Sequence, residues 1–214
     1  MKTGKFIVLE GIDGSGTTTQ AQLLTNYLFE RDKANVVVLT REPTKISPHG
    51  VELRRRLIGN LLPGECVINE PEYWTNLFIN DRLWHSENVV EPSLQMGLQV
   101  VSDRYKLSTI AYQSAQGMDM DELIERHEEL ESPDLTILLD VPAERAIHRM
   151  GGDQQRTKEY FDGLEFQEKV RRNYLRAVEK LRDTEKIVIL DGLKSIKDVM
   201  LAIRKEIDAL YGYQ

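Results

Sequence analysis

Three features are scarce in this sequence of 214 residues: cysteine, long apolar runs and excess positive charge. Its one cysteine, Cys66, cannot form an intramolecular disulfide and suits a reducing compartment. No apolar run approaches the roughly 18 residues that a membrane-spanning helix needs. The net charge is −7, whereas a broad nucleic-acid-binding surface is basic. We therefore expect a cytoplasmic protein that binds neither membranes nor nucleic acid.

The composition is that of a globular chain, with 41% hydrophobic and 29% charged residues. Its length suffices for one sizeable core, so we expect a single domain over residues 1–214 with a short insertion. Because an apolar run already begins at Phe6, we expect no signal peptide.

Residues 6–20 read FIVLEGIDGSGTTTQ, an apolar strand followed by a glycine-rich turn and the start of a helix. Gly11 and Gly16 have the G-x-x-x-x-G spacing of a P-loop, whose backbone N–H groups and helix N-terminus face phosphate oxygens. Thr18 stands where the motif has its Mg²⁺-binding hydroxyl. Thr17 stands where it has the lysine that reaches the β- and γ-phosphates. The pattern predicts a nucleotide-phosphate site with one defect, and the alternative is a purely structural glycine turn.

Five apolar, β-branched runs alternate with segments of helical spacing, which predicts an α/β fold with a five-stranded parallel sheet buried on both faces. The runs are Phe6–Leu9, Val36–Leu39, Val100–Val101, Leu135–Leu139 and Ile187–Leu190. Acidic residues end or follow four of them, at Glu10, Asp103, Asp140 and Asp191. Ligands of such sheets bind beyond the carboxyl ends of the strands, so these acids mark a candidate site. For Asp140 and Asp191, capping of the next helix is an equal alternative.

Among the residues at these strand ends, Asp103 and Arg104 are the strongest candidates for a phosphate-transfer site. An acid at the end of a buried strand can hold Mg²⁺ in a P-loop protein, and the arginine after it can bind a phosphate through two parallel hydrogen bonds. An internal salt bridge between the two is the alternative interpretation.

Two segments interrupt the alternation of strands and helices. Residues 70–96 form a long helical stretch that Pro92 interrupts near its end. Residues 150–156 read MGGDQQR, a polar connection with two glycines, which predicts a mobile lid near residues 150–158.

Several blocks, spread over nearly the whole chain, resemble the thymidylate kinases, which transfer a phosphoryl group from ATP to dTMP. The blocks are Glu10–Gly16 (EGIDGSG), Arg41–Pro43 (REP), Leu77-Phe78 with Arg82, Asp103–Tyr105 (DRY) followed by Leu107–Thr109 and Ala111–Gln113, and Pro133–Leu135 leading into Leu139–Val141. The resemblance implies a three-layer P-loop kinase fold with a short lid, Mg²⁺ as cofactor and ATP as donor. The implied ATP-binding residues are Gly11, Asp13, Gly14, Ser15, Gly16, Thr17, Thr18 and Thr19, with Thr18 and Asp103 at the metal.

Phe78 and Arg82 are four residues apart and so share one helix face, where a ring can stack on a base and a guanidinium can bind its edge. Taken alone, the pair would fit a core aromatic and a solvated arginine better. The resemblance assigns Phe78 to stacking on thymine, Arg82 to thymine O4 and Thr109 to the pyrimidine ring. The full implied acceptor set is Asp13, Glu42, Arg54, Phe78, Arg82, Arg104, Thr109, Tyr112 and Gln113. The arginine run 54–56 leaves the register of Arg54 uncertain by one residue.

The family has two classes, one with an arginine inside the P-loop and one with arginines in the lid. Gly14 occupies that P-loop position here, so the chain resembles the second class. We expect Arg149 and Arg156 to close over ATP and, with Arg104, to stabilise the transferred charge. The lid lacks a clear D-R-F-E run; Arg156–Glu159 is the nearest match, and Glu159 or Asp162 could supply its acid.

Thr17 is the main departure from the family pattern, because deletion of one preorganised donor costs about 3–4 kcal/mol in comparable sites. Either another cation (Arg149, Arg156 or Arg104) has taken over, or the chain binds nucleotides with impaired catalysis. The acceptor block favours the first explanation. The four histidines, His49, His85, His127 and His148, lack metal-binding spacing, so we expect them at the surface or at caps.

The sequence thus predicts ATP- and Mg²⁺-dependent phosphorylation of dTMP to dTDP. The alternatives are another nucleoside or nucleotide kinase, a regulatory nucleotide-binding module, and a hydrolase that works as a switch. A homodimer is implied by the resemblance, with Tyr73–Val90 as its interface or merely as core.

Overall fold

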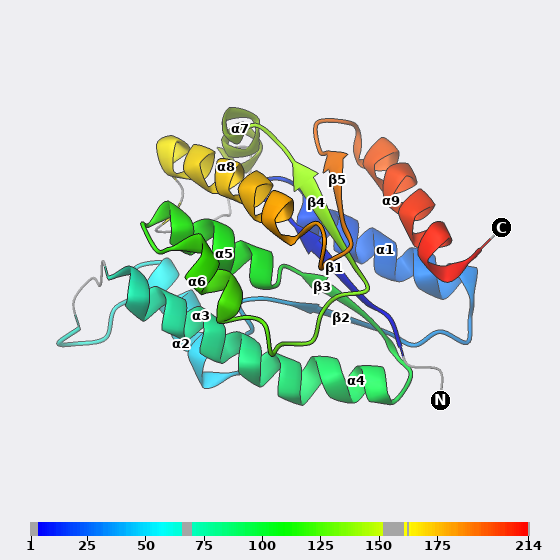
Figure 1. Cartoon of the computed structure of the whole chain (residues 1–214), viewed down its shortest axis with the longest axis horizontal. Coiled ribbons are helices and arrows are strands. Elements are labelled where there is room, and N and C mark those ends of the chain that lie inside the picture. The colour runs from blue at the N-terminus through cyan, green and yellow to red at the C-terminus, as the bar shows by residue number, and fades with distance from the viewer. Residues whose placement is uncertain (1–3, 66–69, 152–160, 162, 214) are drawn as a thin grey trace.

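A computed structural model describes residues 4–65, 70–151, 161 and 163–213 of the chain (Figure 1). One sheet holds five strands in the order β2-β3-β1-β4-β5, and every neighbouring pair is parallel. The strands are β1 (Phe6–Glu10), β2 (Val37–Arg41), β3 (Gln99–Asp103), β4 (Leu135–Asp140) and β5 (Ile187–Asp191). The predicted α/β fold with a five-stranded parallel sheet is confirmed.

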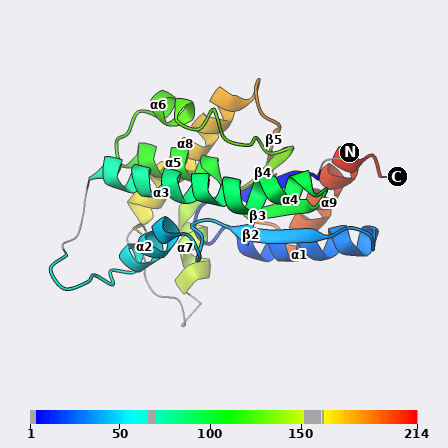
Figure 2. The ribbon, with the colours of Figure 1, turned by 90° about the horizontal axis from the view of Figure 1, so that it is seen from below.

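Helices cover both faces of the sheet and make three layers (Figures 1 and 2). They are α1 (Thr17–Arg31), α2 (Pro48–Leu57), α3 (Pro71–His85), the π-helical turn η1 (Ser86–Val90), α4 (Glu91–Gln95), α5 (Lys106–Ala115), α6 (Met120–Glu125), α7 (Ala143–Gly151), α8 (Leu164–Leu181) and α9 (Ile196–Tyr211). On one face, α1 and α9 bury leucines and isoleucines such as Leu24 and Ile203 against Ile7 and Leu9. On the other face lie α3, α4, α5 and α8. None of the described helices is long and apolar enough to cross a membrane.

The two outer strands differ from the prediction of burial on both faces. All of β1 is buried, but β2 and β5 lie at the sheet edges and alternate between partly exposed and exposed residues. Leu39 of β2 is 43% exposed and Ile189 of β5 is 45% exposed. An edge strand has one strand neighbour instead of two, which leaves more of its surface exposed.

The helical stretch 70–96 keeps its helical path past the proline expected to interrupt it. The change of helix type comes at Ser86, six residues before Pro92, where the wider π-helical turn η1 begins. In this turn the N–H of Glu91 donates to Ser86 O. Pro92 then lies in the first turn of α4, where its missing N–H has no required partner.

The order of the strands brings the candidate residues to one edge of the sheet. β1 and β3 are parallel neighbours, with Leu9 opposite Asp103. β2 lies next to β3, with Arg41 opposite Asp103. The carboxyl ends of these three strands, and the loops that follow them, therefore open on the same side of the molecule.

Candidate active site

The P-loop connects β1 to α1 through residues 11–16, and α1 begins at Thr17. Gly11 approaches the rest of the loop closely, since a Cβ there would lie 2.5 Å from Ser15 Oγ. Gly14 has a φ of +80° and packs against α7, where a Cβ would lie 2.3 Å from Ala146 O. Both positions therefore require glycine, and the loop is fixed against α7 before any ligand binds.

A cavity of ≈700 Å³ opens in front of this loop, and we call it the phosphate cavity. Its walls are residues 13–20, Gly192 and residues 194–196 of the β5–α9 connection, Val199 and Met150, and the cations Arg41, Arg104, Arg149 and Lys194. The structure thus brings together the predicted ATP-binding residues from Asp13 to Thr19, while Gly11 shapes the turn behind them.

Thr18 and Asp103 form a set of oxygens that fits Mg²⁺. Thr18 Oγ1 donates to Asp103 Oδ2 at 2.5 Å. Asp103 Oδ1 is buried and has no hydrogen-bond partner among the described residues. Magnesium typically takes one or two protein oxygens and completes its shell with phosphate and water. No group of three His, Cys, Asp or Glu side chains suited to a metal occurs in the described part of the chain.

Asp13 and Arg104 form the wall between the phosphate cavity and a second cavity, and both residues line both cavities. Arg104 Nη2 donates to Asp13 Oδ1 at 2.8 Å. Asp13 Oδ2 accepts from Tyr112 at 3.0 Å and from Gln167 Nε2 at 3.3 Å. Arg104 has a φ of +78°, unusual for a residue with a side chain. Such backbone strain is typical of a residue that function holds in place.

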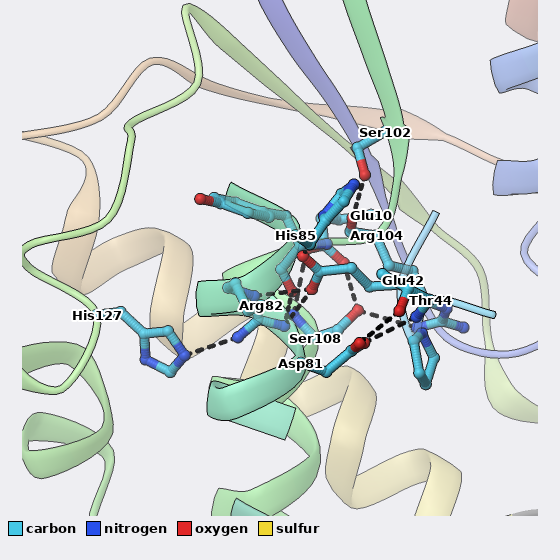
Figure 3. Close-up of polar contacts among 12 residues, drawn as sticks. Glu10, Glu42, Thr44, Asp81, Arg82, His85, Ser102, Arg104, Ser108 and His127 are labelled. Carbon is cyan, nitrogen blue, oxygen red and sulfur yellow. Dashed lines mark hydrogen bonds and ion pairs between the residues drawn. The ribbon is translucent and has the colours of Figure 1, made fainter. Parts of the chain in front are cut away.

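A buried carboxyl group, Glu10, lies close to Arg104 (Figure 3). Glu10 Oε2 accepts from Ser108 Oγ at 2.6 Å and from Tyr174 at 3.1 Å. Arg104 Nη1 donates to the same Ser108 and Tyr174 hydroxyls, at 3.1 and 3.2 Å. Burial raises the pKa of Glu10 to about 7, against the lowering effect of Ser108 and Arg104. The acid predicted at this strand end is therefore a support for Arg104 and not a ligand contact.

Glu10→Gln should flatten the pH dependence of stability. Because the pKa of Glu10 is raised on folding from 4.5 to about 7, the folded state binds the extra proton between these values. Wild-type stability should therefore fall as pH rises from about 4.5 to 7, by up to roughly 3 kcal/mol from this group. Urea unfolding at pH 5, 6, 7 and 8 measures the difference between the two proteins, and parallel stability curves would contradict the assignment.

The second cavity is ≈60 Å³ in volume and is walled by rings, so we call it the aromatic cavity. Its lining is Asp13, Glu42, Pro43, Leu57, Phe78, Arg82, Arg104, Ser108, Thr109, Tyr112, Gln113 and Phe161. Phe78 is half-buried on α3, and Thr109, Tyr112 and Gln113 come from one face of α5. Thr109 Oγ1 and Gln113 Nε2 are buried, with no hydrogen-bond partner in the described ranges. These are two polar groups available to a ligand.

Arg82 is buried in a network that joins three segments of the chain (Figure 3). Its guanidinium lies 2.6 Å from Glu42 Oε2, donates to Tyr105 O at 3.0 Å and contacts His127 Nε2 at 2.7 Å. Of five N–H groups, these contacts leave one Nη1–H for a ligand. Burial would raise the pKa of Glu42, but Arg82 and His85 hold it below its usual value. Glu42 thus orients Arg82 with one oxygen and holds His85 with the other.

Two histidines of this network were wrongly expected at the surface or at caps. His127 Nδ1 contacts Leu123 O at 2.5 Å, and a carbonyl only accepts, so Nδ1 carries the proton and Nε2 accepts from Arg82. Burial and then Arg82 lower the pKa of His127 to about 3, so the ring is neutral. His85 Nδ1 lies 2.8 Å from Glu42 Oε1. No local spacing signals this arrangement, because each histidine and its partner are more than 40 residues apart in the sequence.

Arg54 is distinguished from its two neighbours by its partners. Its side chain donates to Thr44 O at 3.2 Å and to Pro43 O, in the loop that follows Glu42. Arg55 and Arg56 form ion pairs with Glu52 and Glu65. The charged-face alternative therefore holds for Arg55 and Arg56. Arg54 lies beside the loop at the aromatic cavity without being part of the cavity lining.

Asp81 on α3 holds that loop in place. Asp81 Oδ2 accepts from the Thr44 N–H at 2.7 Å, and Oδ1 accepts from Thr44 Oγ1 and Ser47 Oγ. Ser47 in turn caps α2 by accepting from the Gly50 N–H at 2.8 Å. This buried support was not predicted from the sequence.

Of the predicted lid near residues 150–158, the structure describes only Met150 and Gly151, together with residues that flank the lid. Arg149 lines the phosphate cavity, and its guanidinium donates to Gly192 O at 2.8 Å and Ser15 O at 3.4 Å. Arg156, Glu159 and Asp162 lie outside the described residues. Phe161 lines the aromatic cavity, with its ring centroid 5.6 Å from that of Trp74 and its ring stacked on Phe166. Its sequence context did not predict a place in the site.

The last two strand-end acids have structural partners. Asp140 pairs with Arg171 at 2.6 Å, and Asp191 Oδ1 accepts from the Leu193 N–H at 2.9 Å. Neither caps the next helix, and neither lines the two cavities.

Comparison with known proteins agrees with this geometry. The family model described as thymidylate kinase matches residues 9–203. A probable thymidylate kinase of Pyrococcus horikoshii is 41% identical over 198 residues, which is 92% of both chains. One of Thermococcus kodakarensis is 37% identical over 92% of this chain and 96% of its own. A thymidylate kinase of Carboxydothermus hydrogenoformans is 33% identical over 98% of this chain and 99% of its own. This chain belongs to the thymidylate kinase family and is a phosphotransferase of the dTMP kinase type.

Proposed function

We propose that the chain transfers the γ-phosphoryl group of ATP to dTMP in the synthesis of dTTP, with ATP in the phosphate cavity and dTMP in the aromatic cavity. An oxygen of the dTMP phosphate attacks the γ-phosphorus, and the bond from that phosphorus to the β,γ-bridging oxygen breaks, releasing ADP. The observation that carries this proposal is the shared wall of the cavities, where Asp13 and Arg104 face both sides. A transferred group must pass through such a junction.

On the donor side, the P-loop backbone and the N-terminus of α1 hold the phosphates. Thr18 and Asp103 would hold Mg²⁺, which supplies charge neutralisation at the β- and γ-phosphates. We propose that Thr17 stands in place of the usual P-loop lysine, so that other cations supply the missing charge. Arg149 covers the transferred group, and Arg156 is assigned to the same role by its position in the lid, near residues 150–158 of a single domain.

On the acceptor side, Phe78 stacks on thymine, the remaining Arg82 N–H donates to O4, and Thr109 Oγ1 bonds the ring. Tyr112 and Gln113 contact the base and sugar, and Arg54 and Arg104 hold the phosphate. Support comes from the buried unpartnered atoms of Thr109 and Gln113 and from the fixed position of Arg82. At ≈60 Å³ the aromatic cavity is smaller than a pyrimidine nucleotide, so acceptor binding must widen it.

A coupled assay for ADP, run with and without acceptor, tests the proposed function. We expect ADP release that depends on dTMP, with weaker activity on dUMP, dCMP, AMP and thymidine, because Thr109 and Arg82 match thymine and Arg104 requires a phosphate. Release with AMP or thymidine above that with dTMP would indicate a different nucleoside or nucleotide kinase. Acceptor-independent phosphate release would indicate a hydrolase, and ATP binding without ADP release would indicate a regulatory module.

We further propose a cytoplasmic homodimer. One face of α3 is buried core, but apolar side chains remain exposed at Val51 on α2, at Ile58 just after α2 and at Leu83 on α3. α2 and α3 pack together, so these residues could be covered by a second copy. Sedimentation velocity of the purified chain would detect a monomer if this is wrong.

A further inference from the structure

The P-loop presents no positively charged side chain to the β- and γ-phosphates, because Thr17 carries a hydroxyl where the motif has a lysine. Four cations line the phosphate cavity instead: Arg41, Arg104, Arg149 and Lys194. The contacts of these side chains, together with their positions around the cavity, identify one of them as the replacement. This inference rests on the proposed function.

Two of the four cations are held by other groups. Arg104 is bound to Asp13, Ser108 and Tyr174, on the wall toward the acceptor. Arg149 donates to two backbone carbonyls, of Gly192 and Ser15, which fix it on the side of the β5–α9 connection.

Arg41 is exposed and, within the described ranges, its guanidinium has no hydrogen-bond or ion-pair partner. It ends β2 directly opposite Asp103 in the sheet. Besides the phosphate cavity, Arg41 lines a neighbouring cavity of ≈240 Å³ together with Thr18 and Asp103. It therefore lies on the side of the P-loop where the Mg²⁺ oxygens are, and where the β- and γ-phosphates must be held.

We propose that Arg41 contacts the β- and γ-phosphates of ATP and replaces the charge absent at Thr17. A guanidinium can bind two phosphate oxygens in parallel, and a long side chain at a strand end reaches over the metal site from the β2 edge. The P-loop lysine would approach the same oxygens from the first turn of α1. Arg41 and a lysine at position 17 would therefore neutralise the same phosphate charge. Restoring the lysine should make Arg41 dispensable.

A double-mutant cycle with Arg41→Met and Thr17→Lys tests this directly. With Thr17 present, Arg41→Met should lower kcat for dTMP by about a hundredfold, the size expected for one preorganised donor. In the Thr17→Lys protein, the same Arg41 change should cost less than about threefold, because the lysine already neutralises the phosphates. Equal losses in both backgrounds would overturn the proposal, as would a rise confined to KM for dTMP.

Lys194→Met is the matched control, since Lys194 lines the same cavity from the β5 edge, opposite β2. Its effect should be independent of residue 17, and coupling at Lys194 instead of Arg41 would refute the assignment. A binding measurement separates this inference from the function itself. When Thr17 is present, Arg41→Met should weaken the binding of ATP, relative to that of AMP, by at least about tenfold, the order of magnitude of one charge-assisted contact to phosphate. In the Thr17→Lys protein the ratio of the two affinities should not change. That ratio can be measured even if dTMP proves not to be the acceptor.

Discussion

Replacing Arg104 with methionine should lower kcat by about a thousandfold, since loss of one preorganised group costs about 3–4 kcal/mol and each tenfold in rate is about 1.4 kcal/mol. Arg104 faces both cavities, and its Nε–H and one Nη2–H are not used by Asp13, Ser108 or Tyr174. Those two donors are available to the phosphate that moves. Single-turnover kinetics with saturating ATP and dTMP would measure the loss in the chemical step.

Arg171→Met is the matched control for Arg104. Arg171 also pairs with an aspartate, Asp140 at 2.6 Å, but it is not part of the lining of either cavity. Its loss should leave kcat within about threefold of the wild-type value, because a surface ion pair contributes little free energy. Urea unfolding of both variants distinguishes lost chemistry from lost folding. A folded Arg104→Met protein with near wild-type turnover would disprove the role of Arg104.

Asp103→Asn should have the second largest effect, a fall in kcat of at least about a hundredfold with a weaker response to Mg²⁺. The change keeps the shape of the side chain but removes the charge beside Thr18 and alters the buried Oδ1 that has no partner in the described residues. The Mg²⁺ concentration for half-maximal rate should rise by roughly tenfold or more, as expected when a charged oxygen ligand becomes neutral.

Asp140→Asn serves as the comparison for Asp103, because Asp140 also ends a central strand but pairs with Arg171 away from both cavities. Its Mg²⁺ dependence should match the wild type. If Asp103→Asn kept the wild-type Mg²⁺ response, the metal would have to be held elsewhere.

The sequence predicted those parts of the site in which chemistry requires particular residue types at short spacing. The P-loop and the block 103–113 are contiguous, so their phosphate, metal and acceptor groups could be assigned before the fold was known. The five strands were also predicted, because buried parallel strands are continuous apolar runs. Which strands lie at the edges could not be predicted in this way, since strand order is set by packing and not by composition.

The supports behind the site were missed for a different reason. Glu42 and Arg82 were predicted as acceptor-site residues, but their partners His85 and His127 were not. These histidines meet them only because β2, α3 and the segment after α6 fold together. Tyr174 reaches Glu10 from a helix more than 160 residues later. Each of these residues alone is compatible with an ordinary surface or core position. Their roles depend on burial and on distant partners, and no spacing pattern in a single sequence indicates either.

The contact between Gly14 and the backbone of Ala146 limits which residue can stand at the centre of the P-loop. Any larger residue in the centre of the loop would have to push the seventh helix outward, and that helix carries Arg149. An arginine in place of Gly14 is therefore incompatible with the present position of Arg149. Placing an arginine in the P-loop would therefore require a coordinated redesign of two elements, and a single point change would not achieve it.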